Sequence, residues 1–363
     1  MRRRIKIALM VLTVLVAAAL VAGIGYEQVG RARDRKRLPQ IGRSVDIGGR
    51  TLNISCVGSG TPAVIFESGG DAPGLSWAQL QKEVAKFTEA CWYDRAGIGW
   101  SDSGPYPRTS AAICTDLHAL LKNAGVPPPY VLAGASFGAL NSRVYAGMFP
   151  NEVAGLVFID SAHEDESVRA PRFYLARTAP RFLWRPLDLS LRAASFTGLL
   201  RLSESSALHI ENSPQMSADE MIVALRAEPK SIVTNITTGV VLPESYAEAR
   251  AITRLGDTPL VVLTAGQPLD FGDPELNRQA QAYQQVWIHE MQAELAGAST
   301  RGRQVVVANA THATIPDEVV VDAIRDVLSQ IHGGGTKSSN EWGRGVICRV
   351  SGRPWRQARR RRT

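Results

Sequence analysis

One serine of this chain has the neighbours of a nucleophile. Residues 130–139 read YVLAGASFGA, so Ser136 has Gly134 and Gly138 two positions away on either side. The apolar run before the serine predicts a strand, and the segment after it predicts a helix. A serine on such a turn adopts a strained backbone conformation, which glycine neighbours leave room for. We therefore predict that the Ser136 hydroxyl attacks an acyl carbonyl; the alternative is an ordinary strand–helix turn that contains a serine.

A serine nucleophile needs a general base, which histidine most often supplies. Among six histidines, His312 alone follows the last apolar strand pattern, QVVVANAT, and precedes the closing helix pattern, DEVVVDAI. This position places an imidazole where it can reach the serine. The alternative for His312 is a surface loop. The other five lie in or beside predicted helices or at the domain edge: His118, His163, His209, His289 and His332.

Three aspartates compete to orient the histidine. Asp270, in TAGQPLDFGDP, follows the next-to-last strand pattern, and its place gives the chain order Ser–Asp–His expected of this arrangement. Asp273 lies three residues farther on. Asp160 ends the strand pattern GLVFID, and an acid at that earlier strand can reach the same imidazole. We prefer Asp270 and keep Asp160 as the alternate acid, since an aspartate near Gly and Pro more often caps a loop.

Two backbone N–H groups are candidates for an oxyanion hole. The N–H of Phe137 follows the serine at the start of the predicted helix, where it has no partner within the helix. The second donor is expected in the loop after the strand pattern AVIFE, which reads SGGD, and we choose the N–H of Gly70. Glycines let a backbone approach a substrate oxygen closely, although a plain tight turn is the alternative.

Two further groups of residues suggest other chemistry. The run His163-Glu164-Asp165 has the residue types of a metal site, but three adjacent side chains cannot share one ion without further ligands. We predict a polar start to a helical segment there. Four aromatic residues that follow suit either core packing or an acyl pocket: Phe173, Tyr174, Phe182 and Trp184.

Strand and helix patterns alternate around these residues. The strands are almost wholly apolar, which predicts a parallel sheet that helices cover on both faces. This α/β core comprises residues 45–162 and 257–332. Between its two parts, residues 163–256 show helix patterns without a strand and predict a helical cap. Residues 333–363 lack apolar periodicity and end in RQARRRRT, so we predict a disordered basic tail.

The N-terminus contains a segment long enough to cross a membrane. Residues 7–25 carry no charge and follow MRRRIK, and as a helix they reach about 30 Å. We predict a membrane anchor in residues 1–30 and a basic linker in 31–44. A cleaved signal peptide, which would give a secreted protein, is the alternative. Basic residues flank the segment on both sides, so the positive-inside rule does not fix its orientation.

Charge is distributed unevenly along the chain. The first 38 residues carry a net charge of +7 and the last 31 carry +8, whereas the whole chain carries only +7, so the body between them carries −8. An acidic body argues against nucleic-acid binding. The basic ends suit anionic lipid head groups or remain solvated.

The four cysteines lack zinc-site spacing. Cys56 and Cys91 both lie in strand-like segments and could pair outside the cytoplasm. Small buried thiols are the alternative.

Several stretches together resemble the α/β-hydrolase superfamily, in particular its bacterial membrane-anchored esterase- and lipase-like members. They include ARDRKRLPQIGRSVDIGGRTLNISCVGSG, VIFESGG, YDRAGIGWSD, GASFGALNSRVYAGMFPNEVAGLVFIDSAHED and the His312 segment. The resemblance implies an eight-stranded, mostly parallel sheet with a cap between strands six and seven. It also implies catalysis by Ser136, His312 and an acid, with no metal or organic cofactor. Such relatives usually read G-H-S-x-G-G, whereas this chain has Ala135 and Ala139, which puts the choice of substrate in doubt.

The sequence therefore predicts a serine hydrolase that cleaves a carboxylic ester, or a related acyl bond, of a small-molecule substrate. The turn holds no aspartate nucleophile, so dehalogenase and epoxide hydrolase chemistry is not expected. A perhydrolase or amidase of the same fold is an alternative, and so is a non-catalytic ligand-binding protein. We expect one N-terminal helix in a bacterial inner membrane and the catalytic domain outside the cytoplasm.

Overall fold

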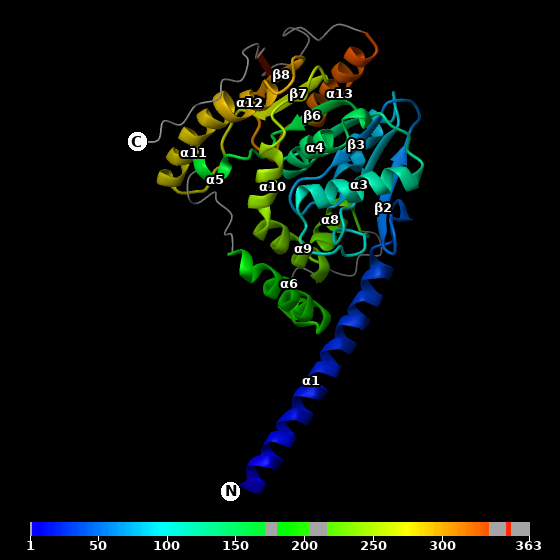
Figure 1. Ribbon diagram of the computed structural model, residues 1–363, viewed down its shortest axis with the longest axis vertical. Helices are drawn as coiled ribbons and strands as arrows, with labels where there is room; N and C mark the ends of the chain where they lie inside the picture. Colours follow the sequence, from blue (N-terminus) through cyan, green and yellow to red (C-terminus); the bar gives the residue numbers. More distant parts are fainter. Residues whose placement is uncertain (1, 171–179, 204–215, 334–345, 350–363) are drawn as a thin grey trace.

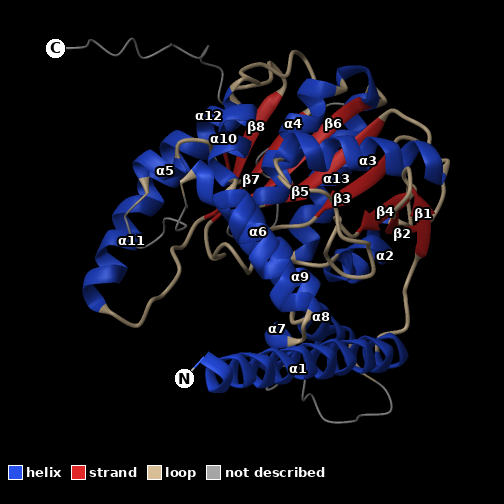
Figure 2. Ribbon diagram, turned by 60° about the horizontal axis from the view of Figure 1, so that its bottom comes forward, coloured by secondary structure: helices blue, strands red, loops and turns tan. Residues whose placement is uncertain are grey.

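The computed structural model describes residues 2–170, 180–203, 216–333 and 346–349. A long N-terminal helix, α1 (Arg2–Arg37), projects from a layered α/β body (Figures 1 and 2). We predicted that a linker begins at residue 31. The structure differs, because α1 continues as one helix as far as Arg37.

Among the described residues, nine strands form one sheet in the order β1-β2-β4-β3-β5-β6-β7-β8-β9. The strands β3 to β8 pair in parallel, while β1, β2 and β9 are attached in antiparallel. The predicted mostly parallel sheet of the α/β-hydrolase fold is confirmed by β1 to β8. The strand bounds are β1 Arg43–Asp46, β2 Thr51–Val57, β3 Ala63–Glu67, β4 Ala90–Tyr93, β5 Tyr130–Ala135, β6 Val153–Ile159, β7 Leu260–Ala265, β8 Gly302–Val307 and β9 Val346–Arg349.

The ninth strand lies within the tail that we predicted to be disordered. Residues 346–349 read VICR and pair with β8, from Val346 beside Val307 to Arg349 beside Gln304. Without β9, this edge of β8 would expose unpaired backbone groups. A four-residue strand is too short to produce a clear period-2 pattern, which is why the sequence did not predict it.

Helices cover both faces of the sheet, as the apolar strands predicted (Figure 2). On one face α3, α4, α10 and α12 pack against residues such as Leu132 and Phe158, and on the other face α2, α8 and α13 pack against Val131 and Val157. The core helices are α2 Ala78–Val84, α3 Ser110–Ala124, α4 Phe137–Met148, α11 Pro274–Val286, α12 Gln292–Ala296 and α13 Asp317–Ile331. A π-helical turn, η3 (Trp287–Met291), joins α11 to α12.

The described part of residues 163–256 contains helices and no strand, as expected for a cap between β6 and β7. Of the four aromatic residues noted above, Trp184 is buried against Val240 and Val241, whereas Phe182 is exposed. Phe173 and Tyr174 lie outside the described residues. The cap helices are α5 Glu166–Arg169, α6 Arg181–Phe196, α7 Leu199–Ser203, α8 Ala218–Arg226, α9 Pro229–Val240 and α10 Leu242–Arg250.

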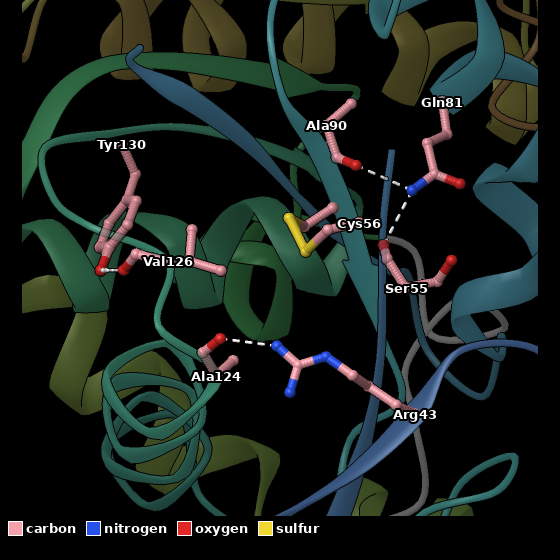
Figure 3. Close-up of a disulfide and its surroundings, with 9 residues drawn as sticks. Arg43, Ser55, Cys56, Gln81, Ala90, Ala124, Val126 and Tyr130 are labelled. Atoms are coloured by element: carbon pink, nitrogen blue, oxygen red, sulfur yellow. Dashed lines mark hydrogen bonds between the residues drawn. A yellow bond between two sulfur atoms is a disulfide. The ribbon is translucent and has the colours of Figure 1, made fainter. Parts of the chain in front are cut away.

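A disulfide links Cys56 of β2 to Cys91 of β4 (Figure 3). The two residues are direct partners in the antiparallel register. The Gln81 side chain lies nearby and donates hydrogen bonds of 2.8 Å to the carbonyls of Ser55 and Ala90, one on each strand. Bridge and glutamine together hold β2 against the rest of the sheet.

Reduction of this disulfide is expected to destabilise the protein. The bridge closes a loop across a separation of 35 residues. A loop of that length corresponds to about 3–4 kcal/mol of free energy of unfolding, or about 5 °C in melting temperature for a domain of this size. Thermal melts with and without dithiothreitol measure the change. The double variant Cys56→Ser/Cys91→Ser is the control, because its melting temperature should not respond to the reductant. A melt of the unaltered chain that stays unchanged while two thiols become titratable would contradict the expectation.

Candidate active site

Ser136 occupies the turn between β5 and α4. Its backbone has φ 53° and ψ −121°, a strained conformation for a residue with a side chain. A Cβ added to Gly134 would lie 2.5 Å from the carbonyl oxygen of Gly138, and one added to Gly138 would lie 2.2 Å from the carbonyl oxygen of Glu67. Neither position accepts a side chain, so both glycines are needed for the turn to close.

Backbone hydrogen bonds fix this turn against the end of β6. The Ser136 N–H donates to the carbonyl of Ile159 at 2.9 Å, and the Ser136 carbonyl accepts from the N–H of Ala162 at 3.0 Å. The Ser136 hydroxyl makes no capping hydrogen bond to α4. The serine therefore lies beside residues 159–162, the segment that carries Asp160.

Asp160 holds His312. The imidazole Nδ1 lies 2.6 Å from Oδ2 of Asp160, and the other carboxylate oxygen accepts from the N–H of Ala265 at 2.9 Å and from the indole N–H of Trp287 at 2.7 Å. The Asp160 side chain is only 4% exposed, whereas that of His312 is 42% exposed. A buried carboxylate thus supports an imidazole that is itself partly exposed.

The carboxylates after β7 make different contacts. Asp270 is exposed, and its Oδ1 accepts from the N–H of Gly272 at 2.9 Å and from the side chain of Asn277 at 2.6 Å. Asp273 caps α11 by accepting from two N–H groups of its first turn. Both therefore have the loop-capping role that aspartates near Gly and Pro commonly take. The geometry favours the alternate acid, Asp160, over Asp270, which chain order had favoured.

The pairing with Asp160 changes the acidity of His312. The hydrogen bond to Asp160 raises the pKa of the imidazole above its ordinary value of 6.5, although burial acts in the opposite direction. The charges of Asp160 and of the nearby Glu166 raise it further. The neutral form that can accept a proton therefore dominates only above this raised pKa.

A buried arginine orders the loop that was predicted to supply the second oxyanion donor. The Arg95 guanidinium donates to the carbonyl oxygens of Gly69, at 2.8 Å, and of Gly70. Because the carbonyl of Gly69 belongs to the same trans peptide as the N–H of Gly70, that N–H points away from Arg95. A Cβ added to Gly69 would lie 3.5 Å from Cβ of Ser136, so the loop borders the serine.

Arg95 is one of several residues whose role the sequence did not indicate, although it lies in the quoted stretch YDRAGIGWSD. Its guanidinium also pairs with the buried carboxylate of Glu67 at 2.9 Å, and Asn141 of α4 donates to the same carboxylate at 3.1 Å. The next residue back, Asp94, is fully buried and accepts from the N–H groups of Gly74 and Trp100. These contacts join the Gly69–Gly70 loop, β4 and α4 into one support around the serine.

In the structure, the segment His163-Glu164-Asp165 lies beside Glu294 of α12. His163, Asp165 and Glu294 lie close enough for their polar atoms to share an ion. However, Arg169 pairs with both carboxylates, at 3.0 Å to Asp165 and 3.2 Å to Glu294, and Arg250 pairs with Asp165 at 2.8 Å. Because arginines already compensate these charges, the cluster suits an ion-pair network that fixes the start of the cap to α12.

A family model described as "Alpha/beta hydrolase family" matches residues 64–323, more than half of the chain. The chain belongs to this family. Among curated relatives, the uncharacterized protein YqjL of Bacillus subtilis is 28% identical over 157 residues, which cover 43% of this chain and 61% of YqjL. An AB hydrolase superfamily protein of Gibberella zeae is 31% identical over 107 residues, or 28% of this chain and 33% of that one. This chain covers 17–61% of the length of the first curated relatives that it matches.

Solved structures share the fold of this α/β hydrolase. A thermophilic esterase from Thermogutta terrifontis matches with a TM-score of 0.51 at 20% identity, covering 81% of this chain and all of the esterase. The enol-lactonase from Burkholderia xenovorans matches with a TM-score of 0.53 at 16% identity, covering 79% of this chain and all of the lactonase. At such low identity the likeness shows the fold alone, so the reaction must be argued from the side chains described above.

Proposed function

We propose that this α/β hydrolase is a serine esterase that works through Ser136, His312 and Asp160. The observation that carries the proposal is the hydrogen bond between His312 and Asp160. Asp160 lies in the same short segment, residues 159–162, to which the strained turn at Ser136 is hydrogen-bonded. Strained backbone at a serine, hydrogen-bonded to the segment whose aspartate orients an imidazole, is an arrangement suited to nucleophilic catalysis.

Each side chain has a defined task in the proposed reaction. Because Nδ1 of His312 is bound to Asp160, Nε2 is the nitrogen that takes the proton from Ser136 as its oxygen attacks the ester carbonyl. His312 then protonates the departing alcohol, which leaves an acyl group on the serine. Water attacks this acyl group with His312 again as base, and the products are a carboxylic acid and free Ser136.

The developing oxyanion needs donors that are already in place. We propose the N–H groups of Phe137 and Gly70, as chosen from the sequence. Phe137 begins α4, so its N–H lacks a partner within the helix. Arg95 donates a hydrogen bond to the Gly69 carbonyl, on the opposite side of the Gly69–Gly70 peptide, and this supports the N–H of Gly70 as the second oxyanion donor. Fixed donors of this kind stabilise charge without reorganising during the reaction.

We further propose that α1 anchors the enzyme to a membrane and leaves the catalytic domain outside the cytoplasm. Among the described residues, α1 is the one helix long and apolar enough to span a bilayer, a test that a signal sequence also passes. Burial of Glu27 and Asp34, both near the end of α1, against Arg201 of α7 supports retention of the helix with the folded domain. The Cys56–Cys91 disulfide supports an oxidising compartment.

A fluorophosphonate probe tests the proposed nucleophile. The full chain in detergent is expected to take up one probe molecule, since the reagent reacts with activated serines. Labelling should survive Ser142→Ala, a matched control because this buried serine lies on the same helix and only donates to the Gly138 carbonyl. Nitrophenyl esters from acetate to palmitate then define the acyl chain. Folded protein that neither reacts with the probe nor hydrolyses any ester would favour a non-catalytic binding protein.

A further inference from the structure

Helix α6 directs its apolar face outward. Phe182, Leu189 and Phe196 are spaced seven residues apart and therefore lie on one side of the helix. They are 76%, 59% and 51% exposed. On the opposite side Trp184 and Asp188 are buried within the cap. A surface helix of a water-soluble domain has the reverse arrangement, with its apolar stripe facing the core.

The exposed apolar face continues onto α7. Leu199 and Leu202 are each more than half exposed, whereas Arg201 between them is buried. We call this surface the outer cap face and define it by the exposed large apolar side chains of the two helices. Its members are Phe182, Leu183, Leu189, Phe196, Leu199 and Leu202. Contiguous exposed apolar surface of this kind indicates a contact with another apolar phase.

The outer cap face adjoins α1 where the uncharged segment ends. A Cβ added to Gly23 would lie 2.4 Å from the carbonyl oxygen of Thr197, which follows α6 directly. The Arg201 guanidinium forms ion pairs of 2.8 Å with both Glu27 and Asp34 of α1. Figure 1 shows α6 at the end of the body from which α1 projects, and Figure 2 shows α7 beside α1.

We propose that the outer cap face is embedded in the surface of the lipid bilayer that α1 spans. This inference rests on the proposed role of α1 as a membrane anchor, because the uncharged part of α1 then places lipid directly beside the α6–α7 turn. An amphipathic helix in this position buries its apolar side chains about 5–10 Å into the boundary between head groups and acyl chains. Arg185 is exposed on α6, and its long side chain could extend to phosphate head groups, whereas Arg181 pairs with Glu244 of the cap at 2.9 Å.

Lipid is the occupant that the structure favours over a second protein. The apolar side chains of α1 from Ile5 to Val21 are exposed and need lipid, and the outer cap face borders their upper end. A bilayer therefore covers both apolar surfaces at once, while a soluble partner would have to fit between the membrane and the cap.

Site-directed fluorescence in lipid nanodiscs tests the inference. The full chain is reconstituted with phosphatidylcholine and phosphatidylglycerol, one copy per disc, in a Cys348→Ser background; Cys114 is buried and the other two cysteines are bridged. A nitrobenzoxadiazole fluorophore is attached at Leu189→Cys or Phe196→Cys. Leu15→Cys in α1 is the reference for lipid, and Ser329→Cys on α13, at the opposite end of the body, is the reference for water.

The expected result is blue-shifted emission and quenching by doxyl-labelled lipid at both α6 positions and at Leu15, with neither effect at Ser329. If the α6 labels behave like Ser329 while the Leu15 label is quenched, the inference fails and the anchor stands. If the Leu15 label is also unquenched, the anchor itself fails, and the inference with it. A blue shift at α6 without quenching by doxyl lipid would show that the labels are covered by protein and not by lipid, and would overturn the proposal.

Discussion

Replacement of Ser136 by alanine is expected to lower kcat/KM for ester hydrolysis by about 10³- to 10⁶-fold. In the proposed mechanism the serine oxygen forms the acyl-enzyme bond and acts as a unit with His312 and Asp160, so its loss removes the bond-forming step. The fold should survive, because the hydroxyl makes no capping hydrogen bond to α4. Initial rates with a nitrophenyl ester, at matched melting temperature, measure the effect.

Ser142→Ala provides the control for this loss. It removes a hydroxyl from the same helix, and its rate should stay within a few-fold of the unaltered enzyme. A Ser136→Ala protein that is folded and retains more than a tenth of the activity would show that the hydrolysis does not pass through this serine.

Asp160→Asn is expected to lower kcat by about 10⁴-fold, whereas Asp270→Asn should change it by no more than a few-fold. The buried Asp160 carboxylate accepts hydrogen bonds from the imidazole, from an indole N–H and from a backbone N–H. An amide in its place would favour the wrong tautomer of His312. Among the contacts described, Asp270 accepts hydrogen bonds only from the nearby Gly272 and Asn277, and it is exposed. Steady-state kinetics of the two variants give the comparison.

The pH profile distinguishes a loss of orientation from a general structural fault. In the unaltered enzyme kcat/KM should fall on acidification through the pKa of His312, which Asp160 holds above 6.5. Asp160→Asn removes the charge that raises this pKa, so the residual activity should persist to lower pH. Asp270→Asn should leave the profile where it was. The opposite pattern, in which Asp270→Asn abolishes activity and moves the profile, would reassign the acid.

Local sequence patterns predicted the positions of Ser136 and His312 because each is tied to the end of a strand. The turn at Ser136 needs two close-packed glycines, and each lies two positions from the serine in the sequence. The choice of acid depends on distant residues instead. Asp160 is held by Ala265 and Trp287, which lie more than a hundred positions away, and its own φ of 44° directs the chain at the end of β6.

The orientation of the cap helices was likewise beyond sequence reasoning. Sequence patterns predicted helices within residues 163–256, but they do not tell which side of a helix faces the core. Core packing was the default expectation for the aromatic residues, and Trp184 follows it, whereas Phe182 does not. The role of Arg95 also depends on tertiary contacts, since its partners are carbonyl groups of a loop 25–27 residues earlier.

The ion pairs between Arg201 and the two acids of α1 join the proposed membrane anchor rigidly to the cap. A catalytic domain on a flexible tether would tumble and sample many heights above its membrane. Here Glu27 and Asp34 sit one above the other on α1, about two turns apart, and fix both the tilt and the rotation of the helix relative to the cap. With α1 in the membrane, the domain would thus keep one orientation. The distance of the proposed active site from the membrane surface would then be fixed by the structure and would not vary as the domain moves.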